Sequence, residues 1–557
     1  MRLEGADNSI LKAIAQTLPE RERPATLFDA ERLAEEAAGR AEAWMRSEGY
    51  YEGVADAVGE DNPPVARVKI TLGQRFAFAP PVIIFESAQP DAEAAKAAGE
   101  ALALVKDGAP ARAGDVLAAE AAAEAALQSG GYPRAKAGQR EAIVDHATGR
   151  MTVTFRFTAG DPVTLGSVIV RPEGVVSPDL VRKFAHWKEG DPYSPEALSE
   201  LRRGLSGTGA FARVGVSLSD ETDAQGDRHV LVRLEPAKPR TIALGASYST
   251  TEGAGLDVEW TLRNATHRAD ELKLSSTLAE KEQKLAASLL RPSGAGRQLN
   301  RRYGVELAHE DTVAFARTGI TVSSGVEADP DLRRALIYGV TLSASQYDKS
   351  EGIENAIVAT VYGGARFDHT DAKFDPTHGY ILEARIEPSA ATGSATTTFV
   401  RATGGARGYW SPANRVTFAG RLNLGWVETI TGSDSDLPLD RRFYAGGGGS
   451  VRGYEYRSIY PLSLTRSADE PPGGRGLVET SAEARFRFGS IWGAAAFIDG
   501  GAAFDTLSEA GDMRWGAGLG LRYNLGFAPV RLDVAAPLNK RPGDPNFAFY
   551  VSLGQAF

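Results

Sequence analysis

Two hydrophobic patterns divide the chain. Up to about residue 238, alanines and leucines recur at the three-and-four spacing of amphipathic helices, with short strands between them. From residue 239 onward the helical spacing stops, and apolar residues alternate with polar residues or glycines along many short segments. The sequence therefore predicts α+β modules followed by a long all-β region.

A unit of helices, a Gly-aromatic turn and two short strands recurs along the first 238 residues. In the first copy Thr26 caps a helix that ends at Gly49, and alternating apolar residues follow. In the last copy Ser177 and Ser194 each precede a proline, a helix-start signal, which indicates two helices per unit. We expect three tandem modules of β-α-α-β-β order, at residues 1–74, 75–160 and 161–238.

The alternation in residues 239–557 is clearest at 513–525, where apolar side chains occupy every second position. A soluble sandwich would also alternate. Here charges and glycines recur on the polar face and aromatics gather at strand ends, as in the girdles of outer-membrane barrels. Counting segments between turn signals predicts a 16-stranded antiparallel transmembrane β-barrel, an even number as such barrels require.

Composition excludes several function classes. The chain has 557 residues, a formal net charge of -10, no cysteine and seven histidines. The charge argues against a nucleic-acid partner, and the absence of cysteine excludes disulfides and thiolate metal sites. No GxSxG, P-loop or HExxH spacing occurs, so we expect no enzyme, no cofactor and no metal site.

Membrane and targeting signals are sparse. No apolar run of about 18 residues occurs, which excludes a transmembrane helix. Residues 1–5 lack the apolar core of a signal peptide, so the chain is expected to be either cytosolic or a trimmed mature form.

The segment 443–461 combines four consecutive glycines with several aromatics around Arg452. Glycine runs do not form strand or helix interiors, and solvated linkers are poor in aromatics, so this segment is predicted to be a docked loop, within a longer loop at about 428–475. On the next two predicted strands, Glu483 and Asp499 occupy the alternate positions whose side chains point into the barrel. Two inward carboxylates need a counter-ion, which Arg452 can supply. Glu479 also faces inward, and we expect it to be solvated.

These motifs resemble the POTRA-barrel superfamily of outer-membrane insertases and translocases, and most closely its TamA (translocation and assembly module) branch. The resemblance rests on the three modules, the barrel, the VRGY loop motif, the FIDGG strand motif and the C-terminal aromatic. The residues concerned are Val451, Arg452, Gly453 and Tyr454; Phe497, Ile498, Asp499, Gly500 and Gly501; and Phe557.

The resemblance implies a bacterial outer-membrane location with the modules in the periplasm, and an Arg452 held by Glu483 and Asp499. It implies that client outer-membrane proteins such as autotransporters are assembled through a lateral seam, without ATP. Partners would be those clients, outer-membrane lipid and an inner-membrane-anchored protein of TamB type. The seam residues would be Thr241, Gly245, Ser247 and Ser249 in the first barrel strand, and Phe547, Gly554 and Phe557 in the last.

The run of four glycines departs from relatives, which usually have a polar residue there, and is expected to loosen the loop. Two alternatives stay open from the sequence. One is a general barrel-assembly insertase, although that usually has five modules. The other is a passive diffusion pore with periplasmic binding modules, which would share the barrel but lack a plugged lumen. A two-partner secretion transporter typically has two modules and an N-terminal plug helix, and the sequence indicates neither.

Overall fold

The structure, a computed structural model, describes the chain except residues 87–88, 295–298, 332, 350–351, 374, 462–472, 527–528 and 554–557. Contacts divide it into two compact units. One comprises Met1–Ile169, His186–Glu200 and Val216–Leu231; the other comprises Val170–Ala185, Leu201–Gly215 and Val232–Phe557. No helix in the described part of the chain is long and apolar enough to cross a membrane.

The first sheet has the order β1-β3-β2 and packs against a long helix. Thr26 caps that helix, accepting a hydrogen bond from the backbone N–H of Asp29 at 3.1 Å. Buried alanines such as Ala34 and Ala41 line its inner face. The elements are β1 (Arg2–Glu4), α1 (Asn8–Thr17), α2 (Leu27–Ser47), β2 (Val54–Glu60) and β3 (Val65–Thr71).

The second sheet differs from the expected β-α-α-β-β order, because two short strands precede its helices. Pro80 and Pro81 lack the N–H that a continuous strand would donate, and they separate these strands. Both pair in parallel with β8, which also pairs with β6 and β7. The elements are β4 (Ala77–Phe78), β5 (Val82–Phe85), α3 (Ala92–Ala101), η1 (Leu102–Val105), α4 (Ala113–Ser129), β6 (Lys136–Ala137), β7 (Glu141–Asp145) and β8 (Arg150–Thr158).

The third sheet has the order β10-β11-β9. Its elements are β9 (Leu165–Arg171), α5 (Pro178–Phe184), α6 (Pro195–Gly207), β10 (Phe211–Thr222) and β11 (Arg228–Pro236). The segment before α5 contacts a barrel turn: Asn264 donates to the carbonyl of Val175 at 2.6 Å, and His267 accepts from the N–H of Ser177 at 3.0 Å. We call this end of the barrel the module end.

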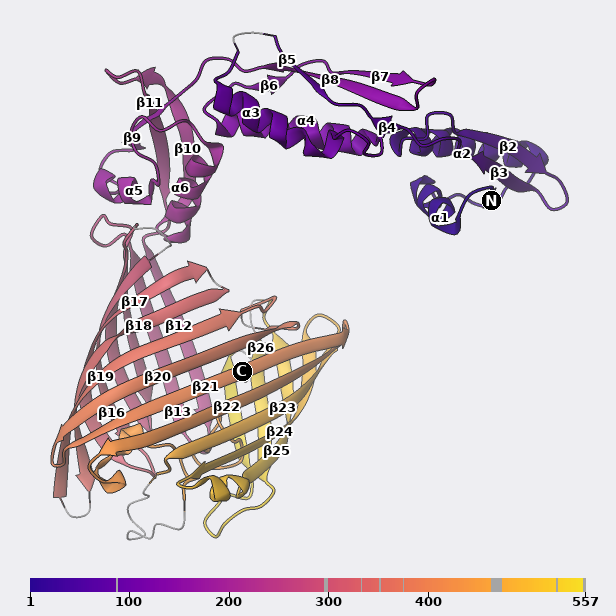
Figure 1. Cartoon of the computed structure of the whole chain (residues 1–557). Helices are drawn as coiled ribbons and strands as arrows, with labels where there is room; N and C mark the ends of the chain where they lie inside the picture. The colour runs from indigo at the N-terminus through magenta and orange to yellow at the C-terminus, as the bar shows by residue number, and fades with distance from the viewer. Residues whose placement is uncertain are drawn as a thin grey trace. The chain divides into compact units, whose positions relative to one another are not determined.

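The remaining strands, β12 to β27, form a closed antiparallel barrel of sixteen strands, which confirms the predicted architecture (Figure 1). Leucines such as Leu342 and Leu519 are exposed on the outer face, whereas the inner face carries charges and glycines. The strands are β12 (Arg240–Ser249), β13 (Gly253–Arg263), β14 (Glu271–Ala279), β15 (Glu282–Pro292), β16 (Leu299–Asp311), β17 (Ala316–Asp331), β18 (Arg334–Lys349), β19 (Gly352–Asp368), β20 (Gly379–Gly393), β21 (Thr397–Ala413), β22 (Val416–Thr431), β23 (Gly476–Phe488), β24 (Trp492–Phe504), β25 (Arg514–Asn524), β26 (Pro529–Pro537) and β27 (Ala548–Leu553).

The ladder that closes the barrel is short. Among the described residues, β12 pairs with β27 at two positions, Tyr248 with Val551 and Ser249 with Tyr550. By contrast, β12 pairs with β13 over its whole length, from Arg240 to Ser249. The two closing pairs lie at the end of the barrel away from the module end.

Candidate functional site

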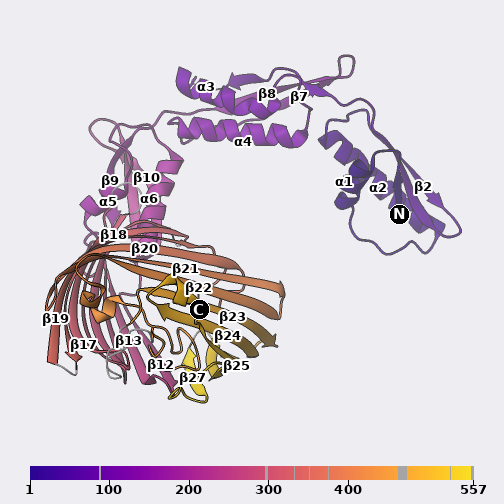
Figure 2. The same cartoon turned by 60° about the horizontal axis from the view of Figure 1, so that its bottom comes forward.

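The loop between β22 and β23 folds back inside the ring of strands (Figure 2). β22 continues to Thr431, so the loop begins a few residues later than the predicted 428. Two backbone bridges give the loop its own shape, Phe443 with Gly474 and Ala445 with Ile459. We call the described residues 432–461 and 473–475 the plug loop.

The glycine run is held rather than loosened, contrary to the prediction. Gly446 and Gly447 have φ of +107° and +101°, a conformation that other residues rarely adopt. The N–H of Gly446 donates to Ser450 Oγ at 2.8 Å, and the N–H of Gly448 donates to Glu252 Oε1 at 2.5 Å. The glycines therefore allow a tight backbone turn in which the N–H groups of Gly446 and Gly448 both have acceptors.

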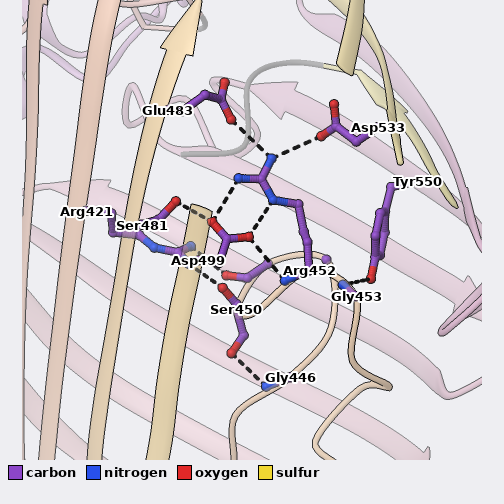
Figure 3. Close-up of polar contacts among 12 residues, drawn as sticks. Arg421, Gly446, Ser450, Arg452, Gly453, Ser481, Glu483, Asp499, Asp533 and Tyr550 are labelled. Atoms are coloured by element: carbon purple, nitrogen blue, oxygen red, sulfur yellow. Dashed lines mark hydrogen bonds and ion pairs between the residues drawn. The ribbon is translucent and has the colours of Figure 1, made fainter. Parts of the chain in front are cut away.

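Arg452 is the centre of the site and is only 2 % exposed (Figure 3). Its guanidinium forms a bidentate pair with Asp499, with Nε at 2.7 Å and Nη2 at 2.9 Å. Nη1 lies 3.1 Å from a carboxylate oxygen of Glu483. The structure thus brings together the three residues that the alternation pattern and the resemblance selected.

A third carboxylate, which the sequence reasoning missed, completes the cluster. Asp533 on β26 is fully buried and accepts from Arg452 Nη1 at 3.1 Å. It also accepts from Arg522, and Glu483 accepts from Arg485 Nε at 2.9 Å. The alternating pattern of residues 529–537 places Asp533 on the inner face, and this signal could have revealed it.

The FIDGG strand shapes the space around Arg452. Phe497 faces inward, and the Arg452 guanidinium lies 3.3 Å from its ring centroid, a cation–π contact. Ile498 points outward and is half-exposed. A Cβ on Gly501 would lie 2.6 Å from a side-chain carbon of Val451, so the strand needs glycine where the loop docks. Gly500 likewise leaves room for the ring of Trp515.

The rest of the VRGY motif joins the loop to the last strands. The N–H of Gly453 donates to the Tyr550 hydroxyl on β27 at 2.9 Å. The Tyr454 hydroxyl donates to the carbonyl of Trp515 at 3.2 Å. Val451 is fully buried. All four motif residues therefore contact the barrel wall on the side of β23 to β27.

Glu479 is not the solvated lumen charge that we expected. It is 7 % exposed, because the plug loop covers it. Its carboxylate accepts from the Ser450 hydroxyl and from Asn423 Nδ2, the latter at 3.0 Å. Arg421 beside it donates to two loop carbonyls, at 2.6 Å and 2.7 Å. Alternation alone could place these residues inside the barrel but could not show that the loop lies over them.

A second group of contacts holds the plug loop to the opposite wall. Asp440 in the loop accepts from Arg317 on β17 at 2.7 Å and from the Tyr347 hydroxyl at 2.5 Å. Arg457 donates to Glu310 at 3.3 Å. Because β17 is sixth and β25 fourteenth in the ring of sixteen strands, the two anchorages face each other across the barrel.

The proposed seam residues are partly described. Ser249 lies in the short closing ladder, whereas Gly245, Ser247 and Thr241 precede it along β12. Phe547 lies just before β27 and is exposed. Gly554 and Phe557 lie outside the described residues.

The carboxylates of the cluster do not form a metal site. In the described part of the chain no group of three or more His, Asp or Glu side chains is arranged to hold a metal ion. Around Arg452 each carboxylate instead bonds a guanidinium. The arrangement is one of charge pairing that holds a loop in place.

Known proteins share both sequence and fold with this chain. The outer membrane protein assembly factor BamA of Nitratidesulfovibrio vulgaris is 24 % identical over 426 residues, which cover 73 % of this chain and 53 % of that protein. The chain thus spans about half the length of this relative.

Two solved structures have a similar fold. BamA from Haemophilus ducreyi lacking POTRA domains 1–3 superposes with a TM-score of 0.65 at 17 % identity, over 86 % of this chain and 100 % of that one. CdiB from Acinetobacter baumannii gives a TM-score of 0.50 at 14 % identity, over 86 % and 90 %. The profile of the Omp85 superfamily domain matches residues 205–557, and with this match over more than half of its length the chain belongs to the Omp85 superfamily.

Proposed function

We propose that this protein is an insertase of the bacterial outer membrane, which assembles client β-barrel proteins through a seam between β12 and β27. The Omp85 domain and the similarity to BamA, an outer membrane protein assembly factor, support insertion as the activity. Its clients include autotransporters, and its modules lie in the periplasm.

The observation that carries the proposal is the short closing ladder. Among the described residues, β12 and β27 share two paired positions, whereas β26 and β27 share six, from Val530–Leu553 to Ala535–Ala548. The β12 side chains before Ser249 are mostly exposed, including Ile242 and Leu244. A strand with unpaired N–H and C=O groups can template an incoming strand by backbone pairing alone.

The plug loop would control this seam. Gly448 contacts Glu252 in the turn after β12, and Gly453 contacts Tyr550 on β27. The loop therefore bonds both sides of the closing ladder, and Arg452 fixes the loop to the neighbouring wall. Strand exchange at an open edge requires no covalent step, so the proposed mechanism uses neither ATP nor a catalytic residue.

The three-module arm supports the finer assignment to the TamA branch. Each module offers edge strands, such as β2 in the first sheet, to an extended peptide. The arm would deliver clients and contact an inner-membrane-anchored partner of TamB type. The apolar outer face of the barrel would contact outer-membrane lipid.

A disulfide lock tests the seam. The chain has no cysteine, so Tyr248→Cys with Val551→Cys introduces a single pair at facing ladder positions. Reconstituted into vesicles, the oxidised protein should fail to assemble a client autotransporter, measured by protease protection, and reductant should restore assembly.

The matched control is Val534→Cys with Phe549→Cys, which locks β26 to β27 one strand away. This control should assemble clients normally in either redox state. Full activity of the oxidised β12–β27 lock would rule out insertion through this seam.

A further inference from the structure

A second feature of the lumen lies apart from the Arg452 cluster. A cavity of about 610 Å³ lies between the plug loop and the inner face of β18 to β22. Five arginines and two carboxylates are among its lining residues. They are Arg366, Arg385, Arg401, Arg442 and Arg457, with Glu383 and Asp440. The cavity is cationic, although the chain carries a formal net charge of -10.

The carboxylates in and beside the cavity are already engaged. Asp440 accepts from Arg317 and Tyr347 of the second anchorage. Glu387 is shared by two arginines, Arg385 and Arg401, each at 2.9 Å. Arginine therefore exceeds carboxylate around the cavity, and this excess favours an anion there.

Three groups around the cavity are donors without a protein acceptor. Within the described ranges, no acceptor lies in hydrogen-bonding reach of Arg401 Nε, Arg457 Nη1 or the Tyr444 hydroxyl, although all three atoms are buried. Buried donors are nearly always satisfied by protein or by water, so donors on two walls of one cationic cavity can bind acceptors that enter it. Arg401 comes from the barrel wall, while Tyr444 and Arg457 come from the loop.

The backbone at Arg457 supports a specific role for its side chain. Its φ of +59° is in the left-handed region, which is uncommon for arginine. The side chain lies over the rings of Phe315 and Tyr456, at 4.9 Å and 5.0 Å from their centroids. Strained backbone of this kind persists where the surrounding contacts fix it.

We propose that this cavity binds a small multivalent oxyanion, a solute with two or more phosphate or carboxylate groups. The planar guanidinium fork matches both groups in geometry, and donors on two walls of the cavity favour a ligand with more than one acceptor group. The ladders from β18 to β22 are paired, so the ligand enters from the lumen rather than sideways from lipid. The proposal is independent of the insertase activity, because binding needs no client.

Isothermal titration calorimetry of the purified full-length chain in detergent tests this site. Pyrophosphate and citrate are the probes, and chloride at the same ionic strength is the monovalent comparison. We expect saturable binding at one site. Loss of a charge-assisted hydrogen bond weakens binding by about tenfold or more, so Arg401→Gln with Arg457→Gln should weaken it at least to that extent. Tyr444→Phe, which removes one hydroxyl, should weaken binding of the probes a few-fold. This single variant tests the site even if the double variant does not fold.

The control is Arg302→Gln on β16, an inward arginine paired with Glu327 and absent from the cavity lining. It should bind both probes as the parent does. Absence of saturable binding by the parent, or unchanged affinity in the double variant and in Tyr444→Phe, would overturn the proposal. Tighter, competitive binding of hexaglutamate would instead assign the cavity to a polypeptide and overturn the small-solute assignment.

Discussion

The barrel is held very differently at its Arg452 cluster and at its closing ladder. Around Arg452, three buried carboxylates pair with Arg452 and with the neighbouring Arg485 and Arg522 across β23 to β26. Between β12 and β27, the described residues form two backbone pairs. The plug loop also bonds both sides of this ladder, which is the basis of the proposal that the loop stabilises the closed edge from inside.

Removing the Arg452 side chain should have the largest effect on barrel stability. Arg452→Ala leaves Glu483, Asp499 and Asp533 buried without their shared cation, and breaking a buried ion pair in this way costs about 3–5 kcal/mol. The urea midpoint of the barrel in vesicles should fall accordingly, and steady current through planar bilayers should appear as the loop leaves the lumen.

Arg302→Ala is the matched control, because its pair with Glu327 is half-exposed and contributes at most about 1 kcal/mol. An Arg452→Ala barrel as stable and as closed as the Arg302→Ala barrel would show that the loop does not depend on this cluster.

Neutralising one carboxylate should have a smaller effect. Asp499→Asn keeps the shape but removes the bidentate partner of Arg452, and a hydrogen bond to a charged group contributes about 1.5–3 kcal/mol. Client assembly and the urea midpoint should both decrease. Glu327→Gln, on the lumen face of β17, should change neither; equal behaviour of the two variants would count against the Arg452 clamp.

A steric test addresses the same docking without changing charge. A Cβ on Gly516 would lie 2.0 Å from the Arg452 carbonyl, so Gly516→Ala must displace the loop or the strand. Overpacking of this kind costs about 1–3 kcal/mol. Gly363→Ala serves as control, because nothing lies within 4 Å of its Cβ position. Equal urea midpoints for the two variants would show that the loop tolerates movement at Arg452.

The alternation of apolar and polar residues along each strand predicted much of this architecture. Period-two alternation is a property of each strand alone, so the number of strands and the inward direction of Glu483 and Asp499 could be predicted from sequence. The same rule applied to residues 529–537 would have added Asp533. It placed Glu479 on the inner face correctly but could not show that this carboxylate is buried, since burial there depends on Ser450 of the loop and Asn423 of a neighbouring strand.

Contacts between distant segments could not be predicted. The bond between Gly448 and Glu252 joins positions 196 residues apart, and neither residue belongs to a recurring pattern. The register of β12 against β27 depends on how the whole barrel closes, which no local alternation specifies. The loop glycines illustrate the same limit, because a glycine run is compatible with a loose segment or with a tight turn.

The smallest expected effect is the most informative about the seam itself. Tyr550→Phe keeps the backbone pair with Ser249 but removes the hydroxyl that accepts from Gly453 at 2.9 Å and, more distantly, from Thr251 in the turn after β12 at 3.5 Å. A neutral hydrogen bond contributes about 0.5–1.5 kcal/mol, so the urea midpoint should barely change. Because the shorter bond joins the plug loop to β27, the seam should nevertheless open more often. In the Tyr248→Cys, Val551→Cys background, the change should slow disulfide formation, whereas the outward-facing Tyr338→Phe should leave it unchanged. If Tyr550→Phe and Tyr338→Phe gave the same rate, the loop would not control the closing ladder, and the direct contacts between the two edges, including those of Thr250 with Phe549, would hold the barrel shut.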